Sequence, residues 1–295
     1  MNISLNDFVT NREAQPQDNP VLQGNFAPVD VENSFEQLEV VGTIPKDLQG
    51  TLLRTGPNPV DPGANHHWFQ GDGMLHGIQL RNGKAMSYRN RWVRTKALEE
   101  KTGIPAAKGG SQLELFTQGS GNVNVVGHGD RVLALPEQGL PYEMDMQLNT
   151  KGLYDYGGKL KSSMTAHPKV DGRTGQMLFF GYELLEPLVR YHEASAAGDL
   201  VKTIDIELPK SIMMHDFGVT ETRVVFMDLP VVFNPEVLEQ GFGFPFQWSD
   251  SHQSRLGIMN RSSDGDNVQW IDIDPCFVFH PLNSYDDGDR IVMDV

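Results

Sequence analysis

The sequence predicts an all-β domain built from a series of small sheets. From about residue 21 to the end, short apolar runs alternate with clusters of Gly, Pro, Asn and Asp, and the chain holds 30 Gly and 18 Pro. Only two stretches, 96–101 and 235–240, look helical, each for a turn or two. This pattern is typical of sandwiches, barrels and propellers. A histidine that recurs in similar surroundings favours the propeller.

The elements follow each other evenly, with no linker or low-complexity break. Residues 1–20 are polar and aperiodic and are expected to form a flexible tail, with one domain over residues 21–295. The strand-like runs are 51–54, 131–135, 177–182, 201–208, 224–229, 269–273 and 291–295. Turn dipeptides stand at Asp72-Gly73, Asn82-Gly83, Asp171-Gly172, Asp264-Gly265 and Asp287-Gly288.

His167, His215 and His280 are each followed, after a turn, by a strand-like run. They are 48 and 65 residues apart, which is roughly the length of one propeller blade, with the second interval lengthened by a long loop. The innermost strand of each blade lines the axis of a propeller. Histidines at the same place in successive blades should therefore converge on that axis.

Three converging imidazoles suit Zn(II), Cu or Fe(II), whereas a single histidine is more often a hydrogen-bonded core or turn residue. The other histidines fit a metal site less well, and His192 and His252 lie in polar stretches that we expect to be exposed. No nucleophile elbow, P-loop or dinucleotide-binding loop is present in the sequence.

Composition excludes other classes. The net charge of −15, from 39 acidic and 24 basic residues, argues against a nucleic-acid partner. The single cysteine, Cys276, excludes a disulfide framework. No apolar run reaches the length of a transmembrane helix and no signal peptide is recognisable. We expect a cytoplasmic protein, with at most peripheral contact to a membrane.

Several motifs, in this order along the chain, resemble the carotenoid cleavage oxygenase family, which includes lignostilbene dioxygenases and retinoid isomerases. The similar segments are Asn25-Phe-Ala-Pro28, Gly42-Thr-Ile-Pro45, Gly50-Thr-Leu-Leu-Arg54-Thr-Gly-Pro57-Asn-Pro59, His67-Trp-Phe-Gln-Gly71-Asp-Gly-Met74-Leu-His76 and Tyr88-Arg-Asn-Arg91-Trp-Val-Arg94-Thr. Ala166-His167-Pro-Lys, Met214-His215-Asp-Phe and Phe279-His280-Pro-Leu-Asn283 follow.

This resemblance implies a seven-bladed β-propeller with Fe(II) on its axis. His167, His215 and His280 match the first three of the four iron-binding histidines of the family. Glu137 matches a glutamate that orients an iron-bound imidazole, a role that fixes the tautomer of the ring. The implied reaction is oxidative cleavage of a conjugated C=C bond by O₂, giving two carbonyl products.

The resemblance implies a carotenoid or apocarotenoid as substrate, with a stilbene as the alternative. In family members, a lysine just before this glutamate accompanies stilbene recognition, and a bulky aromatic residue there is frequent in carotenoid enzymes. This chain has Pro136 before Glu137, which matches neither pattern. A retinyl-ester type isomerase is a further alternative. A substrate tunnel or its entry is expected at an aromatic segment, the alternative being a loop that packs on the propeller face. Its aromatic residues are Phe233, Phe242, Phe244, Phe246 and Trp248.

The chain departs from the family pattern at Val295, where family members continue with further blades and the fourth histidine. We expect the chain to be a fragment of a longer protein, with an exposed strand edge at 290–295. The alternative is an inactive truncated propeller that only binds lipophilic ligands. We also expect these 295 residues alone to bind iron weakly and not to turn over.

Overall fold

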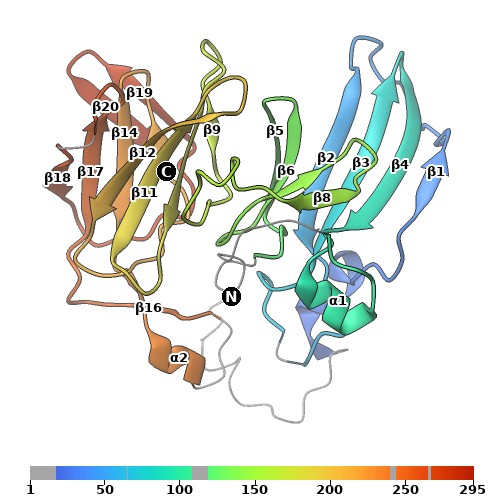
Figure 1. Cartoon of the computed structure of the whole chain (residues 1–295), viewed down its shortest axis with the longest axis horizontal. Coiled ribbons are helices and arrows are strands. Elements are labelled where there is room, and N and C mark those ends of the chain that lie inside the picture. Colours follow the sequence, from blue (N-terminus) through green and yellow to red (C-terminus); the bar gives the residue numbers. More distant parts are fainter. Residues whose placement is uncertain (1–17, 65, 108–118, 240–243, 265–266) are drawn as a thin grey trace.

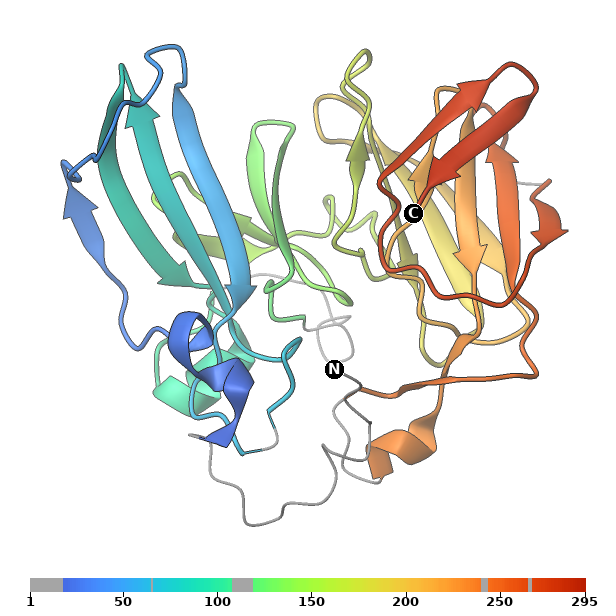
Figure 2. The same ribbon diagram turned by 180° about the vertical axis from the view of Figure 1, so that it is seen from behind.

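The computed structural model describes residues 18–64, 66–107, 119–239, 244–264 and 267–295. Nearly all of its elements are strands, gathered in small antiparallel sheets that follow one another along the chain. Figure 1 shows these sheets in an arc, from the blue N-terminal sheet through the green one to the yellow, orange and red ones, and Figure 2 shows this arc from behind. The predicted all-β propeller architecture is confirmed.

The first two sheets come from the N-terminal half of the chain. The first has the order β1-β4-β3-β2, with β1 (Ser34–Glu36), β2 (Gly50–Pro57), β3 (Gly73–Arg81) and β4 (Lys84–Trp92). The second has the order β5-β6-β7-β8, with β5 (Asn124–His128), β6 (Arg131–Leu135), β7 (Tyr142–Met144) and β8 (Thr150–Leu153). The turn between β3 and β4 has positive φ at both Asn82 and Gly83, the type of hairpin turn that this dipeptide favours.

The next two sheets carry the segments that will form the site. The third has the order β12-β11-β10-β9, with β9 (Lys169–Val170), β10 (Met177–Tyr182), β11 (Leu188–Ala194) and β12 (Leu200–Glu207). The fourth has the order β13-β14-β17-β18, with β13 (Gly218–Val219), β14 (Arg223–Asp228), β17 (Arg255–Asn260) and β18 (Gln269–Asp272). Two hairpins complete the strands: β15 (Val231–Phe233) with β16 (Phe246–Trp248), and β19 (Asn283–Asp287) with β20 (Arg290–Asp294).

Short helices join some of these strands. The 3₁₀ turns are η3 (Pro20–Leu22) and η4 (Gly24–Phe26), and the α-helices are α1 (Lys96–Thr102) and α2 (Pro235–Glu239), close to the two predicted helical stretches. The Thr95 hydroxyl accepts from the Leu98 amide at the start of α1, and Gly103 ends that helix in the left-handed conformation. None of the helices in the described parts of the chain has the length and apolarity needed to cross a membrane.

The predicted N-terminal tail falls mainly on residues 1–17, which lie outside the described residues. Asn19 is described, and its side-chain amide donates to the carbonyls of Ala64 and His66. The division into a tail and a domain over residues 21–295 stays a prediction.

Strand β10 explains why the sheets stack in sequence order. All six of its residues are buried. Leu178 and Phe180 pack in the core shared with the fourth sheet, whereas Met177 and Phe179 pack with residues of the second sheet. Because successive side chains of a strand point to opposite faces, a strand that is apolar on both faces must lie between two other sheets.

His192 and His252 are buried, contrary to the sequence-based expectation that they are exposed. They retain only 1% and 6% of their accessible surface. His192 lies on β11, where Ser162 and Thr203 hydroxyls contact its two ring nitrogens at 2.8 and 2.9 Å. His252 contacts the buried Asp228. Polar neighbours in sequence indicated solvent, but hydrogen-bond partners from other segments allow both rings to be buried.

The buried His192 gives the fold a predictable response to acid. Burial lowers its pKa from 6.5 to about 3, helped by nearby Arg190. Its contribution to stability is therefore complete above pH 6.5 and falls as the pH drops towards 3, because only the unfolded state takes up the proton in that range. We expect the free energy of unfolding, measured with urea, to fall between pH 7 and pH 4.5 by up to about 2.5 kcal/mol more in the unmodified protein than in His192→Gln. Equal losses would contradict this assignment.

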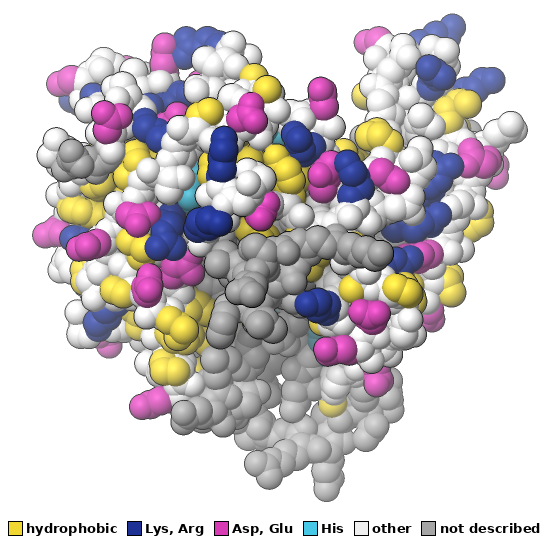
Figure 3. All heavy atoms as spheres, viewed as in Figure 1, with side chains coloured by type: hydrophobic (Ala, Val, Ile, Leu, Met, Phe, Trp, Pro, Cys, Tyr) yellow, Lys and Arg dark blue, Asp and Glu magenta, His cyan; other side chains and the backbone are white. Residues whose placement is uncertain are grey.

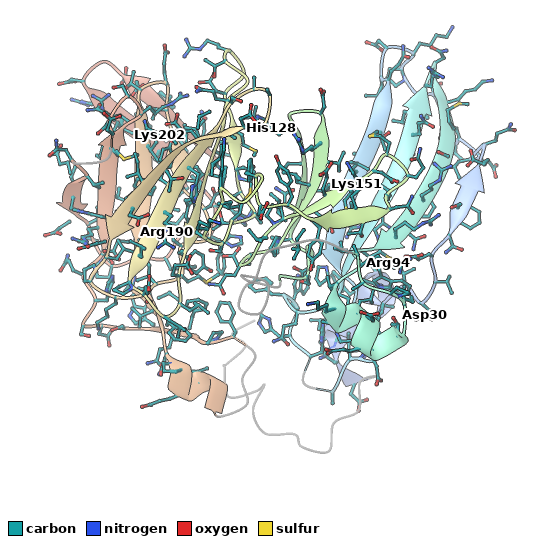
Figure 4. The ribbon with its side chains drawn as sticks, viewed as in Figure 1. Asp30, Arg94, His128, Lys151, Arg190 and Lys202 are labelled. Atoms are coloured by element: carbon teal, nitrogen blue, oxygen red, sulfur yellow. The ribbon has the colours of Figure 1, made fainter. Side chains whose placement is uncertain are left out.

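Charged side chains are spread over the outer parts of the arc. Figure 3 shows acidic and basic side chains interspersed on one face. Among the residues labelled in Figure 4, Arg94 lies beside α1 and forms an ion pair of 2.7 Å with Glu32, and Arg190 lies on β11 and pairs with Asp205 at 3.1 Å. The first pair joins residues 62 positions apart in the sequence, and the second joins the neighbouring strands β11 and β12.

Candidate metal centre

Three histidine rings from three sheets converge at one point. His167, His215 and His280 each stand two or three residues before the first strand of a sheet, which is β9, β13 and β19 respectively. The Nε2 atom of His215 lies 2.8 Å from that of His167 and 3.1 Å from that of His280. Within the described residues they form the one group of three or more potential ligands able to hold a metal ion. The structure thus brings together the histidines that the repeat selected.

The backbone before His167 is fastened to the neighbouring sheets. The Thr165 amide donates to the Phe180 carbonyl at 2.8 Å, and the Asn124 side chain donates to the Ala166 carbonyl at 2.7 Å. Gly181 allows this close approach, because a Cβ atom there would lie 2.0 Å from the Ser163 carbonyl oxygen. A larger residue at position 181 would push this segment, and with it the His167 ring, away from β10.

The segments that carry the other two rings are held in a similar way. Ahead of His215, the Met213 amide donates to the Val231 carbonyl and the Phe233 amide donates to the Ser211 carbonyl, at 2.8 and 2.9 Å. After it, Gly218 approaches the β19–β20 hairpin so closely that a Cβ atom would lie 2.9 Å from the Ser284 hydroxyl. This contact brings the sheets that start after His215 and His280 together.

The local electrostatics favour neutral imidazoles. Burial, together with the other two rings and Lys169, lowers the pKa of His167 to about 3. Burial and the nearby His215 also lower the pKa of His280. Lys169 itself forms an ion pair of 2.7 Å with the buried Asp216, which joins the segments that follow His167 and His215. Neutral imidazole is the form that binds metal ions, so the lowered pKa values favour the ligand form of His167 and His280 at neutral pH.

Glu137 lies on the far side of His215 from the other rings. Its Oε2 atom is 2.7 Å from His215 Nδ1, and both atoms are buried without another partner in the described structure. The two atoms are within hydrogen-bonding distance, but the ring is not aligned for a hydrogen bond. Burial raises the pKa of Glu137, and its contacts with His215 and Tyr182 oppose this rise. With a proton on Nδ1 facing the carboxylate, His215 would direct the lone pair of Nε2 at the cluster.

The described residues between β14 and β17, 229–239 and 244–254, form what we call the aromatic arm, which includes α2 and the β15–β16 hairpin. Phe244 stacks on His67 with ring centroids 5.8 Å apart, and Phe246 packs against Phe233 and Tyr182 at 6.2 and 6.3 Å. Trp248 is half exposed. Phe242, also predicted to line an entry, lies outside the described residues.

The structure adds aromatic residues that sequence reasoning did not select. Phe279 lies edge-on to the His215 ring with centroids 5.6 Å apart, and Phe69 contacts both Phe279 and Phe244 at 6.2 Å. Phe279 is 40% exposed and Phe69 is 50% exposed. In the sequence, Phe279 could have been selected as a site residue because it directly precedes His280. An apolar, partly open wall therefore extends from the histidines towards the aromatic arm.

Asp228, His252 and Arg255 form a cluster of ionic contacts at the base of the aromatic arm, which we call the clasp. Asp228, the last residue of β14, is fully buried and contacts His252 Nε2 and Arg255 Nε, each at 2.6 Å. The Arg255 guanidinium also stacks over the Trp270 ring at 4.0 Å. Asp228 immediately precedes the arm, His252 lies near its end, and Arg255 follows it. One carboxylate therefore holds both ends of the arm.

Comparison with known proteins identifies the family. The family model described as retinal pigment epithelial membrane protein, RPE65, matches residues 26–295. The chain belongs to this family of carotenoid oxygenases. The resemblance carried by the sequence motifs is confirmed, and the arc of sheets is part of the propeller of this family.

Carotenoid oxygenases of several kinds are similar to the chain. A carotenoid cleavage oxygenase of Mycobacterium tuberculosis is 37% identical over 97% of this chain and 66% of its own length. A resveratrol cleavage oxygenase of Aspergillus fumigatus is 37% identical over 94% and 59%. The crystal structure of the lignostilbene dioxygenase of Pseudomonas brassicacearum superposes with a TM-score of 0.81 at 31% identity, covering 93% of this chain and 60% of that protein. The chain thus spans somewhat less than two thirds of the length of these relatives.

Proposed function

We propose that this carotenoid oxygenase is an Fe(II)-dependent dioxygenase that cleaves a conjugated C=C bond of a carotenoid or apocarotenoid into two carbonyl products. The observation that carries the proposal is the convergence of the Nε2 atoms of His167, His215 and His280 beside an apolar aromatic wall. The similarity to a carotenoid cleavage oxygenase over 97% of the chain supports the substrate class.

The donor set suits iron. The three candidate ligand atoms lie within 4.8 Å of one another, and imidazole nitrogen binds Fe(II) as well as Zn(II) and Cu. The set is also uncharged, because all three ligands are imidazoles.

Each group of residues has a distinct task in this proposal. His167, His215 and His280 would hold Fe(II) through Nε2, and Glu137 would fix the tautomer and direction of His215. When bound, iron supplies the activation of O₂ that an organic side chain cannot supply. Phe244, Phe246 and Phe279 would hold the apolar substrate and exclude water.

The decisive test is the fate of labelled oxygen. The protein as its gene encodes it, supplied with Fe(II) and an apocarotenal under ¹⁸O₂, should yield two carbonyl products that both carry the label. Products without label from O₂ would contradict a dioxygenase and favour the isomerase alternative.

A stilbene is the second candidate substrate, because a resveratrol cleavage oxygenase is 37% identical to this chain. Pro136, in place of a lysine before Glu137, argues against it. Parallel assays with resveratrol and an apocarotenal compare the two candidates, and faster cleavage of resveratrol would overturn the carotenoid assignment.

A further inference from the structure

Tyr182 is a buried tyrosine whose hydroxyl group lies next to the metal centre without pointing at it. It is the last residue of β10 and retains 2% of its accessible surface. Its phenol donates a hydrogen bond of 2.8 Å to Oε1 of Glu137. Its backbone carbonyl accepts from the Ser163 hydroxyl at 3.0 Å, which ties the residue to the segment leading to His167.

The two oxygens of Glu137 are divided between two partners. Oε1 accepts from Tyr182, and Oε2 lies 2.7 Å from Nδ1 of His215. A carboxylate held at one oxygen cannot rotate without breaking that bond, so the phenol fixes the position of the other oxygen. Without it, Oε1 would lose its donor and the carboxylate could turn away from His215.

The tyrosine ring is itself held in place. Phe246, from the aromatic arm, packs edge-on against it with ring centroids 6.3 Å apart. On its other sides, Tyr182 belongs to the core shared by the third and fourth sheets. The phenol oxygen is therefore a fixed point of the core to which the more exposed Glu137 is attached.

We propose that Tyr182 is a positioning residue that holds Glu137 in the rotamer that directs His215 Nε2 at the metal. The inference rests on the proposed metal centre. It adds Tyr182 to the chain of contacts that runs from the His215 imidazole to the Glu137 carboxylate. Through Phe246, it also links the aromatic arm to the histidine cluster.

A matched pair of variants tests the proposal. Tyr182→Phe removes only the hydroxyl, and Tyr191→Phe removes the hydroxyl of another buried tyrosine in the same core, which donates to Glu193 Oε1 at 3.0 Å. Calorimetric titration with Co²⁺ should show about tenfold weaker binding by Tyr182→Phe, at the lower end of what partners of metal ligands usually contribute. Tyr191→Phe should bind Co²⁺ like the unmodified protein, even if both variants unfold at a similarly lowered temperature.

A double-mutant cycle checks that the effect passes through Glu137. In a Glu137→Gln background, Tyr182→Phe should cause little further loss of Co²⁺ affinity, because the hydrogen-bonded chain is already interrupted. Independent, additive losses would overturn the proposed route.

A second measurement does not depend on the folding of Tyr182→Phe. With 3-fluorotyrosine placed at position 182, addition of Zn²⁺ should shift the ¹⁹F resonance, whereas the same label at position 191 should report no shift. Unmoved resonances at both positions, or equal Co²⁺ affinities of Tyr182→Phe and the unmodified protein, would overturn the role of Tyr182 alone. Failure of the unmodified protein to bind Co²⁺ would instead overturn the metal centre and this inference with it.

Discussion

Replacing His215 with alanine is expected to weaken Co²⁺ or Fe²⁺ binding by at least ~100-fold, because loss of a mere partner of a ligand already costs 10–100-fold. His215 is the ring most central to the cluster: its Nε2 lies 2.8 Å from that of His167 and 3.1 Å from that of His280, and its Nδ1 faces Glu137. The dissociation constant, measured by calorimetry under nitrogen, checks this.

His128→Ala is the matched control for this substitution. His128 is also a partly buried histidine at the end of a strand, but its Nε2 contacts the Gly175 carbonyl and it takes no part in the cluster. His128→Ala should leave metal affinity unchanged. If His215→Ala binds metal as well as His128→Ala, the cluster is not the metal site.

Replacing Asp228 with asparagine is expected to lower the free energy of unfolding by about 3 kcal/mol, since breaking a buried ion pair leaves its partners uncompensated. Asp228 is fully buried and contacts both His252 and Arg255 at 2.6 Å. Because these contacts hold the base of the aromatic arm, we expect local opening of the backbone to increase first along β15. The amides of Met213 and Phe233 join the arm to the segment that leads to His215, and their hydrogen exchange should accelerate.

Asp171→Asn provides the comparison for the clasp. Asp171 pairs with Arg261 at 2.7 Å, just beyond the opposite end of β17 from Arg255. Its replacement should leave exchange at Met213 and Phe233 unchanged. Equal acceleration in both variants would show that the arm responds to general loss of stability and that the clasp has no local role.

Much of the fold could be predicted because its strands are short and locally encoded. The runs at 131–135 and 177–182 coincide with β6 and β10, and the others agree with their strands within a few residues. A short, continuously apolar run between turn signals, such as β10, indicates a strand that is buried on both faces by its length and composition. The turn at Asn82-Gly83 agrees for the same reason, since both residues accept the positive φ that the hairpin needs. Gly73, by contrast, begins β3, and the dipeptide at 264–265 extends outside the described residues.

The expected exposure of His192 and His252 failed for a non-local reason. Nothing within a few residues of either ring reveals Ser162, Thr203 or Asp228, which come from other strands and loops. A polar stretch of sequence predicts an exposed side chain only when no residue from elsewhere in the chain forms hydrogen bonds with its polar atoms.

The all-β repeat, the family resemblance and three histidines in similar surroundings could be inferred from the chain alone, because turn chemistry, motif order and repeat spacing are read directly along it. The packed fold was needed to show that those rings meet, that Glu137 reaches His215 while Tyr182 reaches Glu137, and that Asp228 joins the two ends of the aromatic arm. These contacts join residues from 24 to 113 positions apart. Their geometry depends on how the sheets pack on one another, which in turn depends on strands such as β10 that are buried on both faces.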